Sequence, residues 1–146
     1  MEYLLKKKLA LQLRRFIFSA PTKKFPRVYV YLGISREGLR EYLEKQFHSG
    51  MTWENYGNFW CIDHIVPLDI FGDSLDELKL AWNYLNLRPE INVVNRNKSA
   101  CLFTAKFEIE KRLSFVPQNK ILQKLSEKIV LPVMNDDFYK GFLPLL

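Results

Sequence analysis

Apolar residues recur at three- and four-residue intervals near the start of the chain, which is the spacing of one face of an α-helix. Basic residues fill the positions between them. The apolar positions are Leu5, Leu9, Leu13 and Phe16. This pattern predicts a helix over residues 3–18, and the prolines that follow mark its end.

The next segment, RVYVYLGI at residues 27–34, fits either a short strand or the lead into another helix, because its apolar and other positions alternate over only a few residues. Ser35 is a suitable N-cap for a helix that runs to about Phe47. The segment MTWENYGNF combines turn-forming residues with large aromatics and predicts a loop before a strand that starts near Phe59.

The apolar run NFWCIDHIVPLDIF is interrupted by Asp63 and His64. Charged residues are almost never fully buried without a partner, so this pair needs compensation, and a metal ion is one candidate. Neighbouring residues in a regular strand point to opposite faces. We therefore expect the backbone to depart from strand geometry here and the pair to sit at the strand's end, and Pro67 supports an early termination.

Downstream, Ser74 and Glu77 form an S-x-x-E capping box that predicts a short helix. Its expected inward positions are Leu75, Leu78 and Ala81 or Trp82. The segment NYLNLRPE predicts a second short strand ended by Pro89, and INVVNRNKSA predicts a helix after it. Two further helices are predicted at FEIEKRL and NKILQKLSEKI, separated by Pro117. The predicted fold class is α+β.

Composition supports one folded domain over residues 1–146, since 48% of the residues are hydrophobic and 14% are aromatic. No apolar stretch approaches the roughly 20 residues that cross a bilayer, and the first residues lack the continuous apolar segment of a secretory signal. We therefore expect no membrane partner and a location in the cytoplasm of the host cell. The cysteines are Cys61 and Cys101 only, and their spacing disfavours a structural zinc site or a disulfide framework.

The net charge of +6 is concentrated at the N-terminus, because residues 1–27 hold eight of the 22 basic residues and one of the 16 acidic residues. A basic arm of this kind suits a protein that binds a polyanion, since each phosphate that it neutralises releases counterions. The alternative is a solvated helix face that keeps the protein soluble.

Two segments, WCIDHIVPL and YLNLRPEINVVNRNKSA, resemble the HNH endonucleases, whose core is a ββα-metal fold. The segment before them, LGISREGLREYLEKQFHSGMTWENYG, is similar to the region that precedes this core in phage-type members. Together these segments span residues 32–100. The resemblance implies a ββα-metal core over residues 53–100, with the basic arm (1–27) before it and a helical extension (101–146) after it.

The resemblance also assigns roles. Asp63 and Asn95 would bind one divalent cation, Mg²⁺ or alternatively Mn²⁺, and His64 would be the general base. Asn86, in the tripeptide NLR, would hold the loop that carries His64 by hydrogen bonds without taking part in the chemistry. The residues alone do not choose Asn95 over Asn92, which lies about one helical turn earlier, and many members carry histidine where this chain has Asn95.

These residue types suit phosphodiester hydrolysis. Histidine is largely neutral near pH 7 and can accept a proton from water, and carboxylate and amide oxygens suit a hard cation. Taken singly, His64 would more often be a structural histidine. The expected nucleic-acid contacts are Lys6, Lys7, Lys8, Arg14, Arg15, Arg88, Arg96 and Lys98. For the last three, a solvated helix face is the alternative. The large aromatics between residues 53 and 60 could stack on bases, but packing around the core is the expected role.

The predicted function is a metal-dependent DNA endonuclease, a monomer or homodimer, in a homing, restriction or phage packaging role. Two alternatives remain open. One is a catalytically silent nucleic-acid-binding module of the same fold, and the other is an interaction protein that uses the apolar tail after residue 133.

Overall fold

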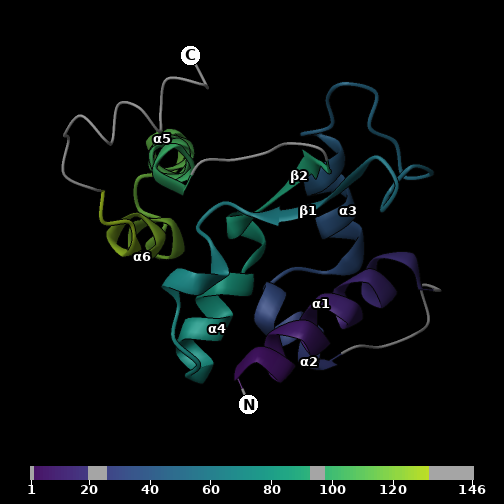
Figure 1. The fold of residues 1–146 in the computed structure, drawn as a ribbon, viewed down its shortest axis with the longest axis horizontal. Helices are drawn as coiled ribbons and strands as arrows, with labels where there is room; N and C mark the ends of the chain where they lie inside the picture. Colours follow the sequence, from purple (N-terminus) through teal and green to yellow (C-terminus); the bar gives the residue numbers. More distant parts are fainter. Residues whose placement is uncertain (1, 20–25, 93–97, 132–146) are drawn as a thin grey trace.

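The computed structural model describes residues 2–19, 26–92 and 98–131 of the 146-residue chain. These residues form a mixed α+β structure with six α-helices and one antiparallel two-stranded sheet, which confirms the predicted class (Figure 1). The elements are α1 (Glu2–Phe18), α2 (Pro26–Leu32), α3 (Arg36–Glu44), β1 (Trp60–His64), the 3-10 helix η1 (Leu68–Ile70), α4 (Leu75–Trp82), the 3-10 helix η2 (Tyr84–Asn86), β2 (Leu87–Ile91), α5 (Lys98–Phe115) and α6 (Lys120–Lys128).

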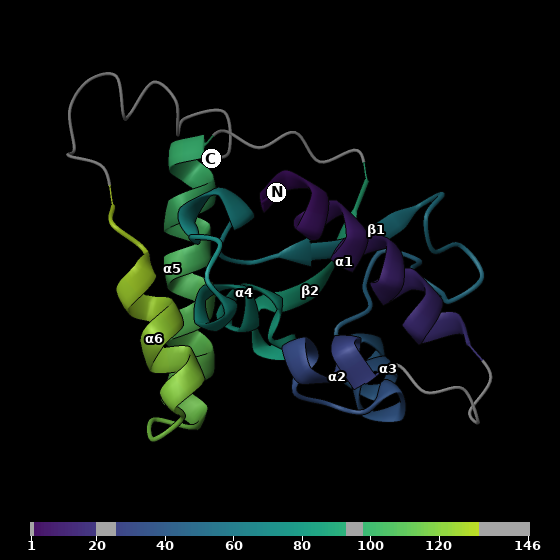
Figure 2. The ribbon, with the colours of Figure 1, turned by 90° about the horizontal axis from the view of Figure 1, so that it is seen from below.

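Residues 2–18 of the basic N-terminal segment form a helix that is docked on the core. Helix α1 matches the predicted range and packs against α2 and α3 (Figure 2). Leu9, Leu13 and Phe16 are buried in the main core, as their spacing predicted. The charged side chains of Lys8, Arg14 and Arg15 are exposed on the other positions of the helix. Side chains before residue 8 lie outside the description, and this includes the predicted contacts Lys6 and Lys7.

The ambiguous segment at residues 27–34 is helical. Val28 and Leu32, four residues apart, are both buried, so helical spacing places them on one face. Gly33 ends α2 with a positive φ of +68°, and its N–H donates to the carbonyl of Tyr29 at 2.8 Å. Ser35 then caps α3 by accepting from the N–H of Gly38 at 3.0 Å, as predicted.

Strands β1 and β2 pair in antiparallel register from Trp60↔Ile91 to His64↔Leu87. The prediction that Pro89 ends the second strand is wrong, because Pro89 lies within β2 opposite Ile62. Ladder bonds join residues 59 and 92 and residues 65 and 86, and their alternation puts the pair Ile62↔Pro89 at a non-hydrogen-bonded position. The proline nitrogen therefore faces away from β1, where no ladder bond is lost.

Helix α4 lies in the connection between the strands. Ser74 caps it by accepting from the N–H of Glu77 at 3.2 Å, as predicted, while the Glu77 carboxylate accepts from the N–H of Gly72 at 3.2 Å. Leu78, Ala81 and Trp82 are buried as expected. The prediction that Leu75 faces inward is wrong, because this first residue of the helix is 55% exposed.

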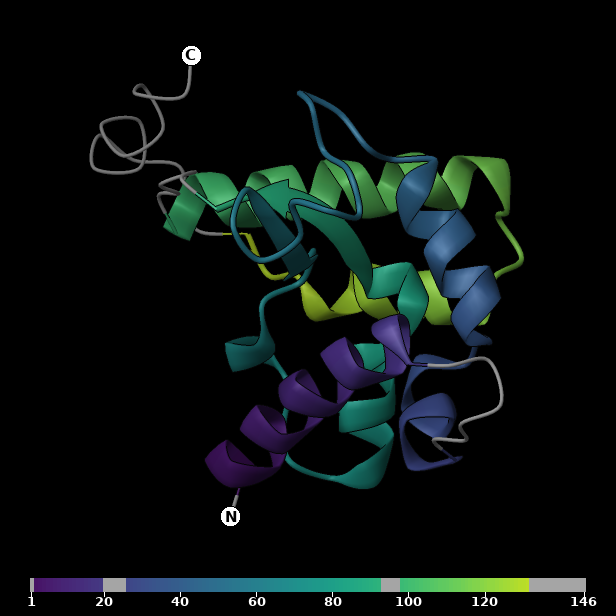
Figure 3. The same cartoon turned by 90° about the vertical axis from the view of Figure 1, so that its right-hand side faces the viewer.

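Helices α5 and α6 pack side by side, and the sheet lies between this pair and helices α1–α3 (Figures 1 and 3). The break between them spans Pro117, as predicted. The C-terminal tail and residues 93–97 lie outside the described residues. The helix predicted over residues 91–100 does not begin at Ile91, which is the last residue of β2, and it is described from Lys98 onward. No helix within the described ranges is long and apolar enough to cross a membrane.

Candidate functional site

The pairing of the strands brings three predicted site residues into one region. Asp63 and His64 are the last two residues of β1, and Asn86 immediately precedes β2. Asn95 and Arg96 fall in residues 93–97, outside the description, as does the side chain of Lys98. The structure therefore places the carboxylate, imidazole and first amide of the predicted set, but not the second amide.

Asn86 is fully buried and makes three side-chain hydrogen bonds. Its Oδ1 accepts from the backbone N–H of Val66 at 2.8 Å, and its Nδ2 donates to the carbonyls of Val66 at 3.1 Å and Ala81 at 2.9 Å. Its own carbonyl accepts from the N–H of Ile65 at 2.8 Å. The two residues that follow His64 are thus fixed to Asn86, and through it to the end of α4. These are hydrogen bonds of the kind that the resemblance implied for this residue.

The imidazole of His64 is half-buried and rests on the indole of Trp82, the last residue of α4. The ring centroids are 4.4 Å apart and the planes meet at 88°, an edge-to-face arrangement. Its Nε2 atom is buried on the protein side of the ring.

Asp63 lies on the other face of the sheet. Pairing continues without interruption through His64↔Leu87, so the predicted departure from strand geometry between Asp63 and His64 does not occur. The position of the pair at the end of the strand agrees with the prediction. Asp63 Oδ2 accepts from Arg88 Nε at 3.2 Å, and this residue lies directly opposite it in the register.

Arg88 is therefore held by acidic groups of the protein. Besides Asp63, its Nε lies 3.8 Å from Glu90 Oε2, and its side chain is only 14% exposed. A guanidinium between two carboxylates is attracted to both and opposes their mutual repulsion. The predicted role of Arg88 as a nucleic-acid contact would require it to leave this position.

The donor chemistry at Asp63 fits the hard cation that the resemblance implies. The Asp63 side chain is 31% exposed, and its carboxylate offers the oxygen donors that Mg²⁺ prefers. Within the described ranges, no group of three or more His, Cys, Asp and Glu side chains is arranged to hold a metal. A cation at Asp63 would have to share this carboxylate with Arg88 or displace the Arg88 guanidinium from it.

Two residues near the site were not assigned to it from the sequence. Trp82 was expected only as a core residue of α4, and Glu90 was given no role. A correct register for the two strands would have paired Asp63 with Arg88, but that register depended on the boundary of β2. The contact between His64 and Trp82 had no local signal, because it joins residues on different elements.

Comparison with known proteins identifies two similar chains, both from Acanthamoeba polyphaga mimivirus. Uncharacterized protein L426 is 33% identical over 92 residues, which cover 62% of this chain and 40% of that protein. Uncharacterized protein L246 is 39% identical over 57 residues, which cover 38% of this chain and 25% of that protein. The matched regions thus span 40% or less of the length of either relative. No protein-family model and no solved structure matches the chain.

Proposed function

We propose that this chain is a metal-dependent HNH-type endonuclease that hydrolyses DNA, with a ββα core made of β1, β2 and the beginning of α5. The order of these elements, with α4 in the connection between the strands, supports the proposal. The observation that carries it is the hydrogen bonding of Asn86, which fixes the backbone immediately after His64. A general base needs such support, because its ring must be held within reach of the water that it deprotonates.

In the proposed reaction, the imidazole of His64 takes a proton from a water molecule. The water oxygen then bonds to phosphorus as the bond from phosphorus to the 3′ oxygen breaks. The departing 3′ oxygen takes a proton from solvent water, which leaves a 5′-phosphate and a 3′-hydroxyl. Trp82 holds the imidazole from the protein side, where Nε2 is buried.

A divalent cation bound by Asp63 and Asn95, Mg²⁺ or Mn²⁺, would supply positive charge next to the phosphate and the departing oxygen. Asp63 contributes an oxygen that is already aligned by Arg88. The Arg88 guanidinium, which binds the same carboxylate, would compete with such a cation for Asp63. A contact between Arg88 and a DNA phosphate would require Arg88 to leave this carboxylate.

The exposed basic residues of α1 would hold the DNA backbone without regard to sequence. Lys8, Arg14 and Arg15 lie on the face of α1 that is not packed into the core. The N-terminal residues Lys6 and Lys7 of the same helix, and Arg96 and Lys98 before and at the start of α5, complete the proposed contacts. The protein would act in the host-cell cytoplasm as a monomer or homodimer, in a homing, restriction or packaging role.

The test is cleavage of supercoiled plasmid by the purified full chain in Mg²⁺ and in EDTA, followed by sequencing of the ends. We expect nicked or linear product in Mg²⁺ only, with 5′-phosphate ends. Loss of that product in His64→Ala, with an unchanged thermal unfolding curve, assigns cleavage to this site. Metal-independent cleavage, or equal cleavage by the variant, contradicts the proposal.

A second candidate function is a nucleic-acid-binding module of the same architecture without activity. The observation that favours it is the placement of Asp63 and His64 on opposite faces of β1, with Asp63 neutralised by Arg88. This candidate predicts a gel shift with plasmid fragments and intact DNA in every divalent metal tested.

A further inference from the structure

An aromatic cluster surrounds the start of β1, at the opposite end of the strand from His64. Its base is Trp60, which is fully buried and donates from Nε1 to the carbonyl of Thr52 at 2.6 Å. Trp53 and Tyr56 meet the Trp60 ring edge to face, with centroids 5.5 and 4.8 Å away. The loop that carries them is therefore held rigidly on the strand.

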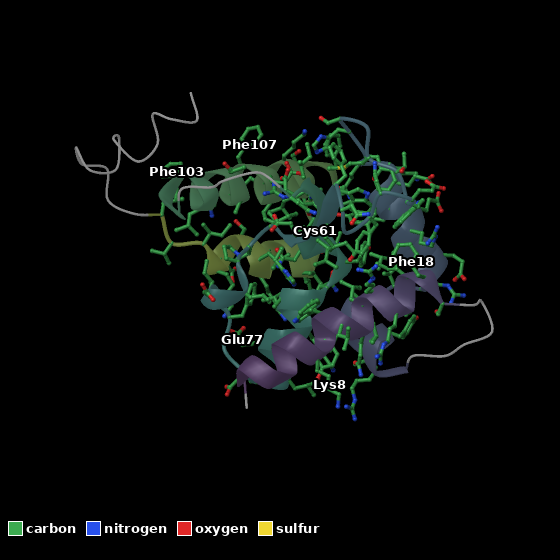
Figure 4. The ribbon with its side chains drawn as sticks, turned by 45° about the vertical axis from the view of Figure 1, so that its right-hand side comes forward. Lys8, Phe18, Cys61, Glu77, Phe103 and Phe107 are labelled. Atoms are coloured by element: carbon green, nitrogen blue, oxygen red, sulfur yellow. The ribbon has the colours of Figure 1, made fainter. Side chains whose placement is uncertain are left out.

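The outermost ring of this cluster is Phe18, the last residue of α1. It lies 5.2 Å from the Tyr56 ring and 6.1 Å from the Trp53 ring, and 45% of the residue is exposed (Figure 4). These contacts, and Arg40 at 5.8 Å from the ring centroid, fix its orientation. A large aromatic that is both fixed and exposed offers a flat surface for a ligand at little cost in conformational entropy.

Positive charge surrounds this ring. The Arg14 guanidinium lies over Tyr56 at 5.6 Å, and Arg15 is exposed on the next position of the same helix. The stretch from residue 8 to residue 18 contains no acidic residue, and Glu54 is the only one between residues 51 and 60. The surface thus pairs a partly exposed aromatic ring with arginine side chains, a combination that fits a ligand with a flat ring and a phosphate.

We propose that Phe18, supported by Tyr56, is a stacking platform for an unpaired nucleotide of a DNA strand, and that Arg14 and Arg15 bind its phosphates. Bases inside a duplex already stack on their neighbours, so an exposed ring of this kind selects unpaired nucleotides. Phosphate contacts from arginine do not depend on base pairing. The choice of DNA as the nucleic acid rests on the proposed function.

The platform is also distinct from the cleavage site. Trp60 and His64 stand at the two ends of β1, and four residue steps along a strand span about 13 Å. Nucleotides bound at Phe18 would therefore lie beside, and not in, the region of His64. This separation allows binding and cleavage to be tested independently.

The test is binding of a fluorescent oligothymidylate of about twelve nucleotides and of a matched hairpin duplex, by anisotropy in EDTA at one salt concentration. Phe18→Ala and Phe18→Leu should each weaken single-strand binding by roughly tenfold or more, with less than about a twofold change for the duplex. Phe18→Leu keeps an apolar side chain for packing, so its folding is the safer of the two. Phe18→Trp should retain tight single-strand binding.

Phe107→Ala is the matched control, because Phe107 is 68% exposed and lies on α5, away from the platform (Figure 4). It should leave both affinities unchanged. Three results would overturn the inference. The Phe18 variants could lose affinity equally for both DNAs, they could lose none, or the unaltered protein could fail to bind the single strand.

These outcomes do not depend on catalysis. Tight single-strand binding that is lost in Phe18→Leu, with no cleavage in any metal, supports the platform and contradicts the nuclease. Cleavage that depends on His64, with no effect of the Phe18 variants on single-strand binding, supports the nuclease and contradicts the platform.

Discussion

The side chain of Asn86 binds both backbone groups of Val66, with Oδ1 accepting at 2.8 Å and Nδ2 donating at 3.1 Å. These two residues are 20 positions apart, and the bonds connect the end of β1 to the start of β2. When the oxygen and nitrogen of a buried amide both make hydrogen bonds, the side chain is held in one conformation, because any other conformation would leave buried polar groups without a partner.

Asn86→Ala should therefore destabilise the fold by about 3 kcal/mol, since three buried hydrogen bonds are lost and backbone groups of Val66 and Ala81 are left unpaired. Urea unfolding at neutral pH measures this loss. Asn83→Ala is the control, because its side chain caps η2 with one bond to the N–H of Leu85 and is only half-buried. A loss in Asn86→Ala no larger than in the control would show that the network contributes little.

His64→Ala should lower the cleavage rate by roughly 10²- to 10⁴-fold, the usual contribution of a general base. The chain has one other histidine, His48, which is exposed and bonded to Ser49. His48→Ala should leave the rate unchanged. Single-turnover cleavage of an end-labelled duplex measures both variants, and similar rates in the two would remove His64 from the mechanism.

Arg88→Gln should lower the Mg²⁺ concentration needed for half-maximal cleavage by several-fold, because it removes the positive charge beside Asp63. The same variant should lower the maximal rate if Arg88 contacts the phosphate once the metal is bound. Lys111→Gln makes the same change in charge at an exposed position of α5 and serves as control. A higher Mg²⁺ requirement in Arg88→Gln would mean that this arginine supports the cation site.

Replacing Lys8, Arg14 and Arg15 with glutamine should weaken duplex binding and flatten its salt dependence. Each lost phosphate contact should reduce the log-log slope by about 0.9. Titrations at several salt concentrations give the slope. The triple replacement of Lys111, Lys120 and Lys124, exposed on α5 and α6, removes equal charge and should leave the slope unchanged.

Glu77 makes stability depend on acid pH. Its hydrogen bond with Lys128, together with that from the Gly72 N–H, lowers the pKa of Glu77 below its ordinary value of 4.5. The stabilisation is fully present above pH 4.5, where the unfolded carboxyl is ionised, and is lost as pH falls through the lowered folded pKa.

Glu77→Gln should therefore cost about 1 kcal/mol at neutral pH and little once the pH is below the folded pKa of Glu77. Urea unfolding across this pH range measures the difference. Glu127→Gln makes the same change at an exposed position of α6 and serves as the control. An identical cost of Glu77→Gln at every pH would show that ionisation of this carboxyl does not stabilise the fold.

Much of the fold followed from local patterns. The helical spacing of Leu9, Leu13 and Phe16 predicted α1, and the N-caps at Ser35 and Ser74 predicted the starts of α3 and α4. These predictions held because a helix closes its hydrogen bonds within a few residues and buries one face at a fixed period. The α+β class followed from the order of these elements.

Strand boundaries and faces were less predictable. Pro89 was expected to end β2. The strand continues because the Pro89 nitrogen faces the edge of β2 that has no partner strand in the described part of the chain. Which edge that is depends on the side of β2 on which β1 pairs. Residues 27–34 could have been strand or helix until the core selected the spacing of Val28 and Leu32. Pairing energies depend on a partner that the local sequence does not specify.

The sequence by itself determined which residue types are present at the candidate site and their order along the chain: a carboxylate and an imidazole side by side, with an amide before the second strand. Only the tertiary structure decided that Asp63 faces Arg88 while His64 rests on Trp82. The reason is physical, because alternation along a strand sends neighbours to opposite faces, and the packing of α4 and β2 then selects the partner that each one meets.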